Sequence, residues 1–281
     1  MARNNSFQTK YGNWALVTGA SAGIGEEYAR QIAAKGLNVV LVARRKQKLE
    51  GLAEELNRKH GVQTRIIAAD LSTPDFMDAI IDGTSDIEIG LLVNNAGIYE
   101  LSNLLEASLE FQLKMLELNT RAPLLLTHHF GKAMKARKRG GIIIVGSTVS
   151  GFGAPTNANY AATKSYDMIL AEGLAAELKD SGVDVQAFLP GGTWTEGSHR
   201  MIAKPSMMIK SMMMETEPTV RASLNGLGKR TIVVPGLMNK TMYFMMSRFM
   251  PRSMAVSMFG MMMNMMNGGT KPSQKSASNP V

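Results

Sequence analysis

The stretch Thr-Gly-Ala-Ser-Ala-Gly-Ile-Gly at residues 18–25 decides the fold of this chain. It follows an apolar run at 14–18 and leads into a segment with helical periodicity at 25–35. A strand, a glycine-rich turn and a helix in this order indicate a dinucleotide-binding unit. Glycines let the backbone approach a pyrophosphate closely, and a helix N-terminus offers it free N–H groups and a positive dipole. The glycine spacing is GxxxGxG rather than GxGxxG, so the strand–turn–helix context carries this prediction.

Apolar runs and helical patterns alternate through the first 190 residues. Most runs are almost continuously apolar, which is typical of parallel strands covered on both faces. The expected strands are 14–18, 38–43, 64–69, 89–94, 141–147 and 184–189, with 231–235 as an edge strand. The expected helices are 25–35, 45–60, 74–82, 109–139 and 160–181. The alternation predicts an α/β fold with a doubly wound parallel sheet of the Rossmann type.

The sequence predicts one large domain with additions at its C-terminal end. The chain has 281 residues, enough for a sizeable core. Residues 1–236 form the predicted dinucleotide-binding and catalytic domain, with a methionine-rich substrate lid at 193–216. Residues 237–266 form an apolar, basic extension. Residues 267–281 are rich in Gly, Ser, Lys, Asn and Pro and are expected to be disordered.

Composition narrows the classes of site. The chain has no cysteine, which excludes disulfides, thiolate catalysis and cysteine-type zinc sites. Its first residues are polar, so we expect no secretory signal and a cytoplasmic protein. Residues 237–281 carry +5 of the net charge of +8. A basic segment of this kind suits phosphate, anionic lipid or nucleic acid, or is simply a solvated tail.

The end of the second expected strand indicates which nicotinamide cofactor is used. An NAD site places an acid about 20 residues after the glycine turn, where it holds the ribose 2′-OH. Ala43 stands at about that place, and Arg44 and Arg45 follow it. Their guanidinium groups offer forked donors for a 2′-phosphate, and Arg44 is favoured because it lies nearer the strand end. The sequence therefore predicts NADP(H), against the alternative of a solvated, basic helix start.

Two further strand ends carry polar or small residues. Asp70 follows the third expected strand and either bonds the adenine or caps the helix that begins near Pro74. The sequence Asn94-Asn95-Ala96-Gly97 ends the fourth. Small residues there suit a backbone packed against a nucleoside, and they also suit an ordinary tight turn.

Tyr160 and Lys164 form the candidate catalytic pair. Residues i and i+4 share one face of a helix, so the phenol and the ammonium can lie side by side. An ammonium favours the phenolate, which makes a tyrosine usable as an acid/base near neutral pH. A Tyr-x-x-x-Lys pattern alone also describes many exposed helical pairs. Ser147 ends the fifth expected strand, and the loop 148–159 can bring it to Tyr160, where it would bond a carbonyl oxygen.

These motifs together resemble the short-chain dehydrogenase/reductase family over roughly residues 12–235. The resemblance implies that Tyr160 is the general acid/base and that Lys164 holds the nicotinamide ribose and tunes Tyr160. It implies that Ser147 orients the substrate oxygen and that Asn119 anchors a water of a proton relay. Thr193, after Pro190-Gly191-Gly192, would meet the nicotinamide carboxamide.

The resulting candidates fall into two sets. The catalytic candidates are Ser147, Tyr160, Lys164 and Asn119. The cofactor-binding candidates are Gly19, Ser21, Gly23, Ile24, Gly25, Arg44, Arg45, Asp70, Asn95, Ala96, Gly97, Tyr160, Lys164, Pro190, Gly191 and Thr193. The resemblance implies no metal, so the four histidines are expected to be structural or exposed.

Methionines mark the expected substrate side. Six of the 23 fall in 201–214 and twelve in 238–266. Methionine makes adaptable apolar walls, although it also simply fills gaps in a core. The run 253–266 is too short to cross a membrane, so 237–266 is expected to lie on a membrane surface or to pack on protein. Residues 12–50 and the Val233, Pro235, Gly236 set are similar to the 17β-hydroxysteroid dehydrogenase type 12-like group.

The leading hypothesis is therefore an NADP(H)-dependent oxidoreductase that acts on an apolar ketone or secondary alcohol, steroid-like, long-chain or otherwise bulky. One alternative is a 3-oxoacyl-thioester reductase of lipid metabolism. A second alternative is a non-catalytic, membrane-associated nucleotide-binding scaffold. Nucleic acid is not an expected partner, because the basic tail has few aromatics for base stacking. The family resemblance implies a homodimer or homotetramer through the helices that carry Asn119 and Tyr160.

Overall fold

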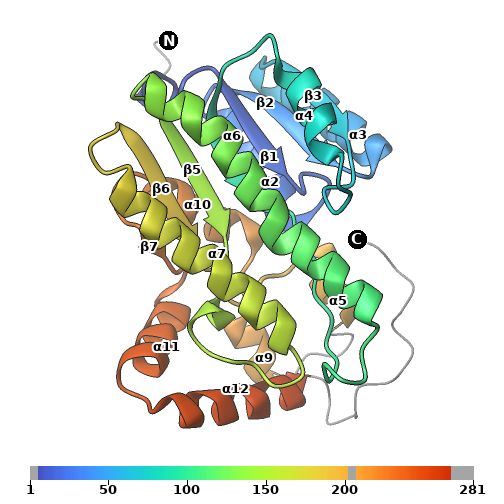
Figure 1. Cartoon of the computed structure of the whole chain (residues 1–281), viewed down its shortest axis with the longest axis vertical. Helices are drawn as coiled ribbons and strands as arrows, with labels where there is room; N and C mark the ends of the chain where they lie inside the picture. Colours follow the sequence, from blue (N-terminus) through green and yellow to red (C-terminus); the bar gives the residue numbers. More distant parts are fainter. Residues whose placement is uncertain (1–5, 202–206, 267–281) are drawn as a thin grey trace.

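The computed structural model describes residues 6–201 and 207–266, which form a seven-stranded sheet with helices on both faces (Figure 1). All strand pairs are parallel, in the order β3-β2-β1-β4-β5-β6-β7. The strands are β1 (Trp14–Thr18), β2 (Asn38–Ala43), β3 (Thr64–Ala68), β4 (Ile89–Asn94), β5 (Gly140–Val145), β6 (Val183–Phe188) and β7 (Ile232–Val233). The predicted doubly wound parallel sheet is confirmed.

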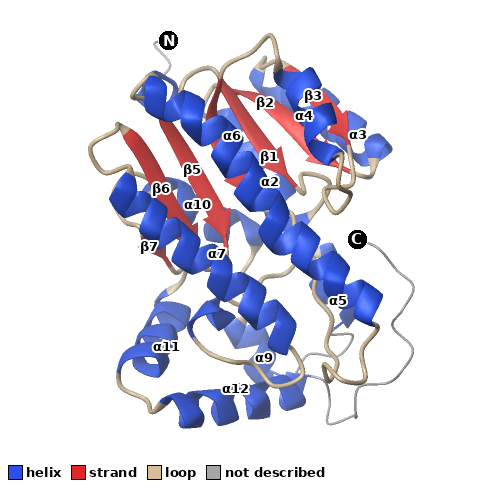
Figure 2. Ribbon diagram, in the orientation of Figure 1, coloured by secondary structure: helices blue, strands red, loops and turns tan. Residues whose placement is uncertain are grey.

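Helices cover both faces of the sheet (Figure 2). One face carries α2 (Gly23–Ala34), α3 (Lys46–His60) and α10 (Thr216–Gly226), whose apolar residues form one core with the strands. The other face carries α4 (Phe76–Thr84), α6 (Ala122–Ala136) and α7 (Ala158–Glu177), which form a second core. The short helix α1 (Ser6–Tyr11) precedes β1. With both faces covered, β4 and β5 are buried at every position, which explains why their sequences are apolar except for Asn94 at the end of β4.

The helical segment predicted at 109–139 is not one regular helix. It consists of α5 (Leu109–Leu116), a π-helical segment η1 (Glu117–Arg121) and α6. A π-helical turn adds one residue within a helix and often occurs at functional sites. Asn119, a catalytic candidate, lies in this segment and is fully buried.

The fifth strand ends earlier than predicted, at Val145, and Ser147 is instead the N-cap of a 3-10 helix, η2 (Thr148–Gly151). The Ser147 hydroxyl accepts a hydrogen bond from the backbone N–H of Val149 (3.4 Å). The Ser150 hydroxyl accepts one from the backbone N–H of Ser147 (3.2 Å). This capping box fixes the chain where it leaves the sheet.

The region predicted as the lid contains two short helices, α8 (Glu196–Met201) and α9 (Met207–Met212). An isolated parallel bridge between Thr193 and Met214 joins its two ends. The predicted extension forms α11 (Leu237–Arg248) and α12 (Arg252–Met266), which lie beyond the carboxyl ends of the strands (Figure 1). The tail predicted at 267–281 lies outside the described residues.

A third, smaller core joins α11 and α12 to η2 and to the first turn of α7. Its buried members are Val149, Phe152, Ala154, Ala161, Met246, Ala255 and Phe259. Tyr160 packs against this core from its edge. Residues 237–266 thus pack on protein in this structure, at the edge of the sheet where the site candidates are.

Candidate active site

The carboxyl ends of the central strands bring the nucleotide-binding candidates together. Thr18 makes the main connection, because its hydroxyl accepts hydrogen bonds from the N–H groups of Asn95 (2.9 Å) and Ala96 (3.0 Å). The Asn95 side-chain amide in turn donates to the Thr18 carbonyl (2.9 Å). The glycine turn after β1 and the turn after β4 are therefore held as one unit.

Two glycines are required by this close packing. Gly19 has a φ of +66°, and a Cβ there would lie 2.8 Å from Nδ2 of Asn95. A Cβ on Gly25 would collide with the Gly19 carbonyl and with the Asn95 amide. The start of α2 is thus packed directly on the backbone of the glycine turn. No side chain caps this helix, so its first N–H groups can serve a pyrophosphate. The residues present fit a nicotinamide dinucleotide at this edge.

Arg45 lies over the same turn. Its guanidinium donates to the Ser21 hydroxyl (3.1 Å) and carbonyl (3.2 Å), and it pairs with Glu196 of α8 at 3.3 Å. Arg44 lies 3.7 Å from Asp70. Both arginine side chains are partly exposed, at 26% and 28%, so both are accessible to a phosphate at the end of β2.

Asp70 does not cap a helix, so that alternative is wrong. The helix α4 begins after Asp75, while Asp70 accepts hydrogen bonds from the backbone N–H and the hydroxyl of Ser72 (3.0 and 2.6 Å). Its other oxygen lies 3.3 Å from the Lys114 ammonium. Burial alone would raise the pKa of Asp70, but the bonds from Ser72 and the charge of Lys114 lower it below the usual value. Asp70 therefore stays ionised beside Arg44.

Tyr160 and Lys164 lie on one face of the first turns of α7, as predicted. The Lys164 Nζ is 6.0 Å from the centroid of the Tyr160 ring. Across from them, a Cβ on Gly97 would lie 3.6 Å from that Nζ. The ring of Tyr99 lies 5.6 Å from that of Tyr160. Burial, and then the charge of Tyr160, raise the pKa of Tyr99 to about 12, so Tyr99 remains a neutral neighbour.

Asn119 joins the turn after β4 to α7. Its side-chain oxygen accepts from the N–H of Ile98 (2.9 Å), and its amide donates to the Ile98 carbonyl (2.9 Å). The amide also donates to the Thr163 hydroxyl (3.1 Å). Thr163 stands next to Lys164 in α7, so Asn119 holds Gly97 and the catalytic pair in fixed relation. A Cβ on Gly97 would lie 3.2 Å from the Asn119 oxygen.

Ser147 reaches the same edge through its cap. The Ser165 hydroxyl of α7 donates to the Ser150 carbonyl (2.8 Å), which ties η2 to the helix of Tyr160. Within 6–201 and 207–266, no direct hydrogen bond joins Ser147 to Tyr160. A carbonyl oxygen between them would be needed to connect the two hydroxyls.

The segment after β6 closes the other side. The Pro190 carbonyl accepts from the N–H of Thr148 (3.0 Å), and the Thr193 hydroxyl donates to the Gly191 carbonyl (3.1 Å). A Cβ on Gly191 would lie 2.7 Å from the amide of Asn239, which belongs to α11. The extension therefore supports the loop that carries Pro190, Gly191 and Thr193.

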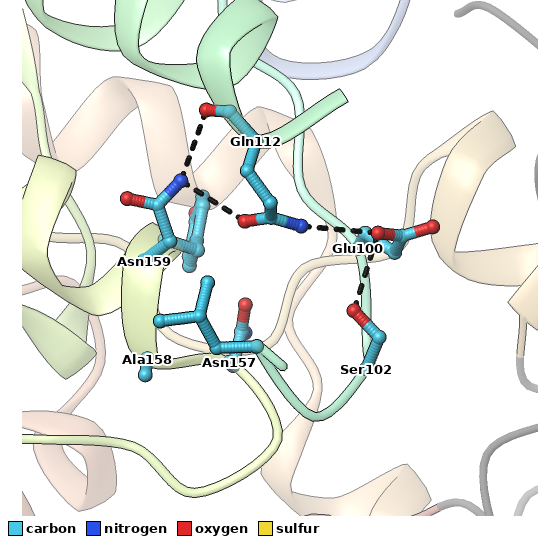
Figure 3. A pocket seen from close by; sticks show the side chains of 8 residues that line it. Glu100, Ser102, Gln112, Asn157, Ala158 and Asn159 are labelled. Carbon is cyan, nitrogen blue, oxygen red and sulfur yellow. Dashed lines mark hydrogen bonds between the residues drawn. The ribbon is translucent and has the colours of Figure 1, made fainter. Parts of the chain in front are cut away.

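A small polar pocket borders Tyr160, and Figure 3 shows its labelled side chains around the opening. It is lined by Glu100, Ser102, Leu104, Gln112, Asn157, Ala158, Asn159 and Tyr160. The Glu100 carboxylate accepts from Gln112 (3.1 Å) and from Ser102 (3.2 Å). Asn157 contributes a buried side-chain oxygen that has no hydrogen-bond partner among the described residues. Sequence reasoning missed this pocket, because its members come from three separate segments.

Sequence reasoning also missed Asp167. Its carboxylate lies 2.9 Å from the Lys164 Nζ, and the two side chains are 2% and 6% exposed. The Lys164 Nζ also donates to the Val145 carbonyl at the end of β5 (2.8 Å). The spacing of three residues in a helix was the signal that could have found this pair.

Two kinds of site are absent from the described residues. Within residues 6–201 and 207–266, no group of three His, Asp or Glu side chains lies close enough together to hold a metal ion. Over the same ranges, no helix is both long enough and apolar enough to pass through a membrane.

The comparisons with known proteins agree with this geometry. Residues 13–205 match the protein family described as short chain dehydrogenase. A 7beta-hydroxysteroid dehydrogenase of Collinsella aerofaciens is 30% identical over 237 residues, which are 84% of this chain and 90% of that protein. A very-long-chain 3-oxoacyl-CoA reductase of Scheffersomyces stipitis is 34% identical over 240 residues, 80% of this chain and 66% of that protein.

Solved structures show the same similarity. A structure of a 7beta-hydroxysteroid dehydrogenase superposes with a TM-score of 0.86 at 28% identity, over 90% of this chain and 98% of that one. A short-chain dehydrogenase from Sphingobium yanoikuyae in complex with NADPH gives 0.73 at 32% identity, over 85% and 96%. A bulky-bulky ketone specific alcohol dehydrogenase from Comamonas testosteroni gives 0.71 at 30% identity, over 85% and 96%.

Proposed function

Because the chain belongs to the short-chain dehydrogenase family, we propose that it uses NADP(H) to interconvert a bulky, apolar ketone and its secondary alcohol. The chain is an oxidoreductase that takes a nicotinamide cofactor and acts on a carbonyl or alcohol group. The observation that carries the finer proposal is the placement of Tyr160, Lys164 and Gly97 at the sheet edge that also holds the glycine turn. A phenol and an ammonium meet there beside the backbone of Gly97.

The proposed roles follow from this placement. A bound nicotinamide supplies the hydride in reduction and accepts it in oxidation. In reduction, Tyr160 gives its phenolic proton to the substrate oxygen while the carbonyl carbon becomes the carbinol carbon. The Lys164 ammonium stabilises the resulting phenolate and donates to the ribose. Ser147 orients the same oxygen. Asn119 keeps α7 in register with the turn at Gly97 and anchors the water that returns a proton.

The cofactor proposal rests on Arg44 and Arg45. No acid stands at the end of β2, and both guanidinium groups are accessible beside the glycine turn. Ser21 is already within hydrogen-bond distance of Arg45, so a 2′-phosphate there would meet a hydroxyl and two cations. The NADPH complex of the Sphingobium relative supports the choice of NADP(H).

The substrate proposal rests on the surroundings of Tyr160. One side is the third core, built from η2, α7, α11 and α12, with Met242, Met250 and Met258 at its margin. An apolar wall of this kind suits a steroid-like or other bulky ketone, and the names of the two dehydrogenase relatives point the same way. The polar pocket of Figure 3 would receive a small polar substituent. A 3-oxoacyl thioester is the second candidate, supported by the acyl-CoA reductase relative.

We also propose a homo-oligomer. Helices α5 to α7 expose apolar side chains, including Leu109 (72%), Leu113 (52%) and Ile169 (61%). A second copy would cover them. Exposed apolar side chains in this region are Leu237 (81%) of α11, Phe249 (67%) between the two helices and Met254 (57%) of α12. We therefore also propose peripheral membrane contact for 237–266.

The test is a panel of bulky ketones, simple ketones and 3-oxoacyl thioesters with NADPH or NADH, read by loss of nicotinamide absorbance. Tyr160→Phe is the key variant. We expect a loss of kcat of about 1,000-fold with little change in the Kd for NADPH, because only the proton donor is removed. Tyr99→Phe is the matched control and should keep turnover. Near-normal turnover in Tyr160→Phe, or no reduction of any bulky ketone by the unmodified chain, would contradict the proposal.

A further inference from the structure

The buried Asp167 has no role in the chemistry described so far. It lies one helical turn after Lys164 on α7, and the two side chains are almost completely excluded from solvent. Two of the three N–H groups of the Lys164 ammonium are engaged, one by the Asp167 carboxylate (2.9 Å) and one by the Val145 carbonyl (2.8 Å). One N–H remains for a partner on the side of Tyr160 and Gly97.

A buried ammonium needs a reason to stay charged. Removing a charge from water costs several kcal/mol, and an unpaired buried amine releases its proton instead. Burial alone would lower the pKa of Lys164, but the carboxylate of Asp167, and then the charge of Tyr160, raise it above the usual value. Burial raises the pKa of Asp167, and the Lys164 ammonium opposes that shift. Each charge therefore depends on the other.

We propose that Asp167 is a positioning residue, which keeps the Lys164 side chain charged and aimed at Tyr160 and the cofactor ribose. The inference rests on the proposed function, since Lys164 is proposed there to serve both Tyr160 and the cofactor ribose. Asp167 touches neither substrate nor cofactor and acts only through Lys164. The carboxylate and the Val145 carbonyl together fix the direction of the remaining N–H.

The surroundings leave Asp167 as the counter-charge of this ammonium. Gly97, in the turn after β4, lies beside the Lys164 ammonium and carries no charge. Asn119 of η1 has a neutral amide, which contacts Thr163, the residue before Lys164. On α7 itself, Tyr160 and Tyr166 are the titratable neighbours. On other elements packed against α7, Lys114 of α5 pairs with Asp70, and Asp184 of β6 pairs with Lys10. Arg121 of η1 pairs with Glu117 of the same segment. Tyr243 of α11 donates to the Met168 sulfur of α7.

A merely structural role would have a different signature. Replacing a buried ion pair often leaves stability unchanged or improves it, while removing one partner leaves the other unpaired. Moreover, the second carboxylate oxygen of Asp167 is buried and has no partner among the described residues. Burying this carboxylate costs free energy that an apolar side chain of similar size would not cost. Its ion pair with Lys164 accounts for its presence.

The test compares Asp167→Asn with Asp167→Glu and with Asp180→Asn, an exposed aspartate just beyond the same helix. The full-length variants are assayed for kcat/KM of ketone reduction against pH, and for NADPH Kd against pH. In Asp167→Asn the Lys164 amine should lose its proton at lower pH. We expect kcat/KM at pH 7 to fall about 10-fold, because the ammonium is no longer aimed at Tyr160. The alkaline limb of kcat/KM should move down by at least about one pH unit, because the amine loses its proton more easily.

NADPH affinity should weaken over the same pH range, because the ribose loses a charged donor. Asp167→Glu should restore part of the pH profile, and Asp180→Asn should match the unmodified chain. Binding separates this inference from the proposed function. A chain that reduces no ketone, but whose NADPH Kd acquires the expected pH dependence in Asp167→Asn, keeps the inference and loses the function. Asp167→Asn with unchanged pH profiles for turnover and binding, whatever its melting temperature, overturns the inference, as does an alkaline limb that moves to higher pH.

Discussion

The nucleotide side and the methionine-rich side of this molecule are built by opposite rules. On the nucleotide side, backbone packs on backbone, as where Gly19 and Gly25 approach the turn at Asn95 with no room for a methyl group. On the other side, 18 of the 23 methionines lie in 201–214 and 238–266, and the short helices and the third core have flexible side chains at their margins. A dinucleotide has the same shape in every turnover, so a rigid backbone can bind it. Methionine side chains are unbranched and polarisable, so they can adapt to the shape of an apolar substrate.

Helix α7 contacts both of these sides. Its Met168 and Ala171 belong to the core on the sheet, while Ala161 belongs to the third core. Tyr160 and Lys164 lie at the end that both sides share. Changes on one side should therefore affect binding of one ligand and leave the other largely intact.

The largest effect should come from Gly25→Ala. The new methyl group would collide with the Gly19 carbonyl and the Asn95 amide, so the glycine turn must move. We expect a loss of stability of about 3 kcal/mol and of NADPH affinity of at least about 100-fold. The measurements are chemical unfolding and NADPH titration.

Gly51→Ala is the matched control, because a Cβ at Gly51 of α3 meets nothing within 4 Å. It should keep NADPH affinity and gain ~1 kcal/mol of stability from the better helix former. Full NADPH affinity in Gly25→Ala would refute a rigid nucleotide side.

A smaller effect should follow from Phe259→Ala, which removes the ring that packs on Phe152 at 5.4 Å. Truncating a buried phenylalanine costs roughly 3–5 kcal/mol locally, enough to release α12 from η2. We expect kcat/KM for bulky ketones to fall about 10-fold, which corresponds to about 1.4 kcal/mol of lost transition-state stabilisation. The Kd for NADPH should stay within about twofold, because the buried members of the third core belong to neither the glycine turn nor the turn at Asn95. The exposed Phe249→Ala should change neither quantity. A larger loss of NADPH affinity than of kcat/KM would show that the two sides are not independent.

The smallest effect should come from Arg45→Ala. Its guanidinium bonds Ser21 and pairs with Glu196, so it links the glycine turn to the lid. Loss of one charged donor to a 2′-phosphate should raise KM for NADPH about 10-fold and leave KM for NADH unchanged. Lys46→Ala serves as the control, because that side chain is 70% exposed. Equal effects on NADPH and NADH would mean that Arg45 serves the turn and not the phosphate.

Much of this architecture could be predicted because it depends on local patterns. The predicted strand limits differ from the observed ones by at most two residues, since burial on both faces requires continuous apolar runs. The placement of Tyr160 beside Lys164 likewise follows from helical spacing. Such features are set by residues close together in the sequence.

Features that depend on contacts between distant segments could not be predicted in this way. The surroundings of the Lys164 ammonium, which pairs with Asp167, come from β5 and the turn at Gly97, which lie far from it in the sequence. The pocket that joins Glu100, Gln112 and Asn157 depends on where α5 meets α7. The apolar composition of 237–266 indicated a covered surface, but not that η2 would be the partner.

The π-helical turn at Glu117–Arg121 has a consequence for insertions and deletions. Each residue of a helix turns it by about 100°, so a single additional residue sets α5 and α6 out of phase with each other. This offset lets α6 keep its apolar face on the sheet while Asn119 turns toward Ile98 and Thr163. Deleting one residue here would give a more regular helix with a different phase, and the Asn119 side chain would lose its three hydrogen bonds to Ile98 and Thr163. The number of residues between α5 and α6 is therefore constrained, because a change of one residue alters the position of Asn119.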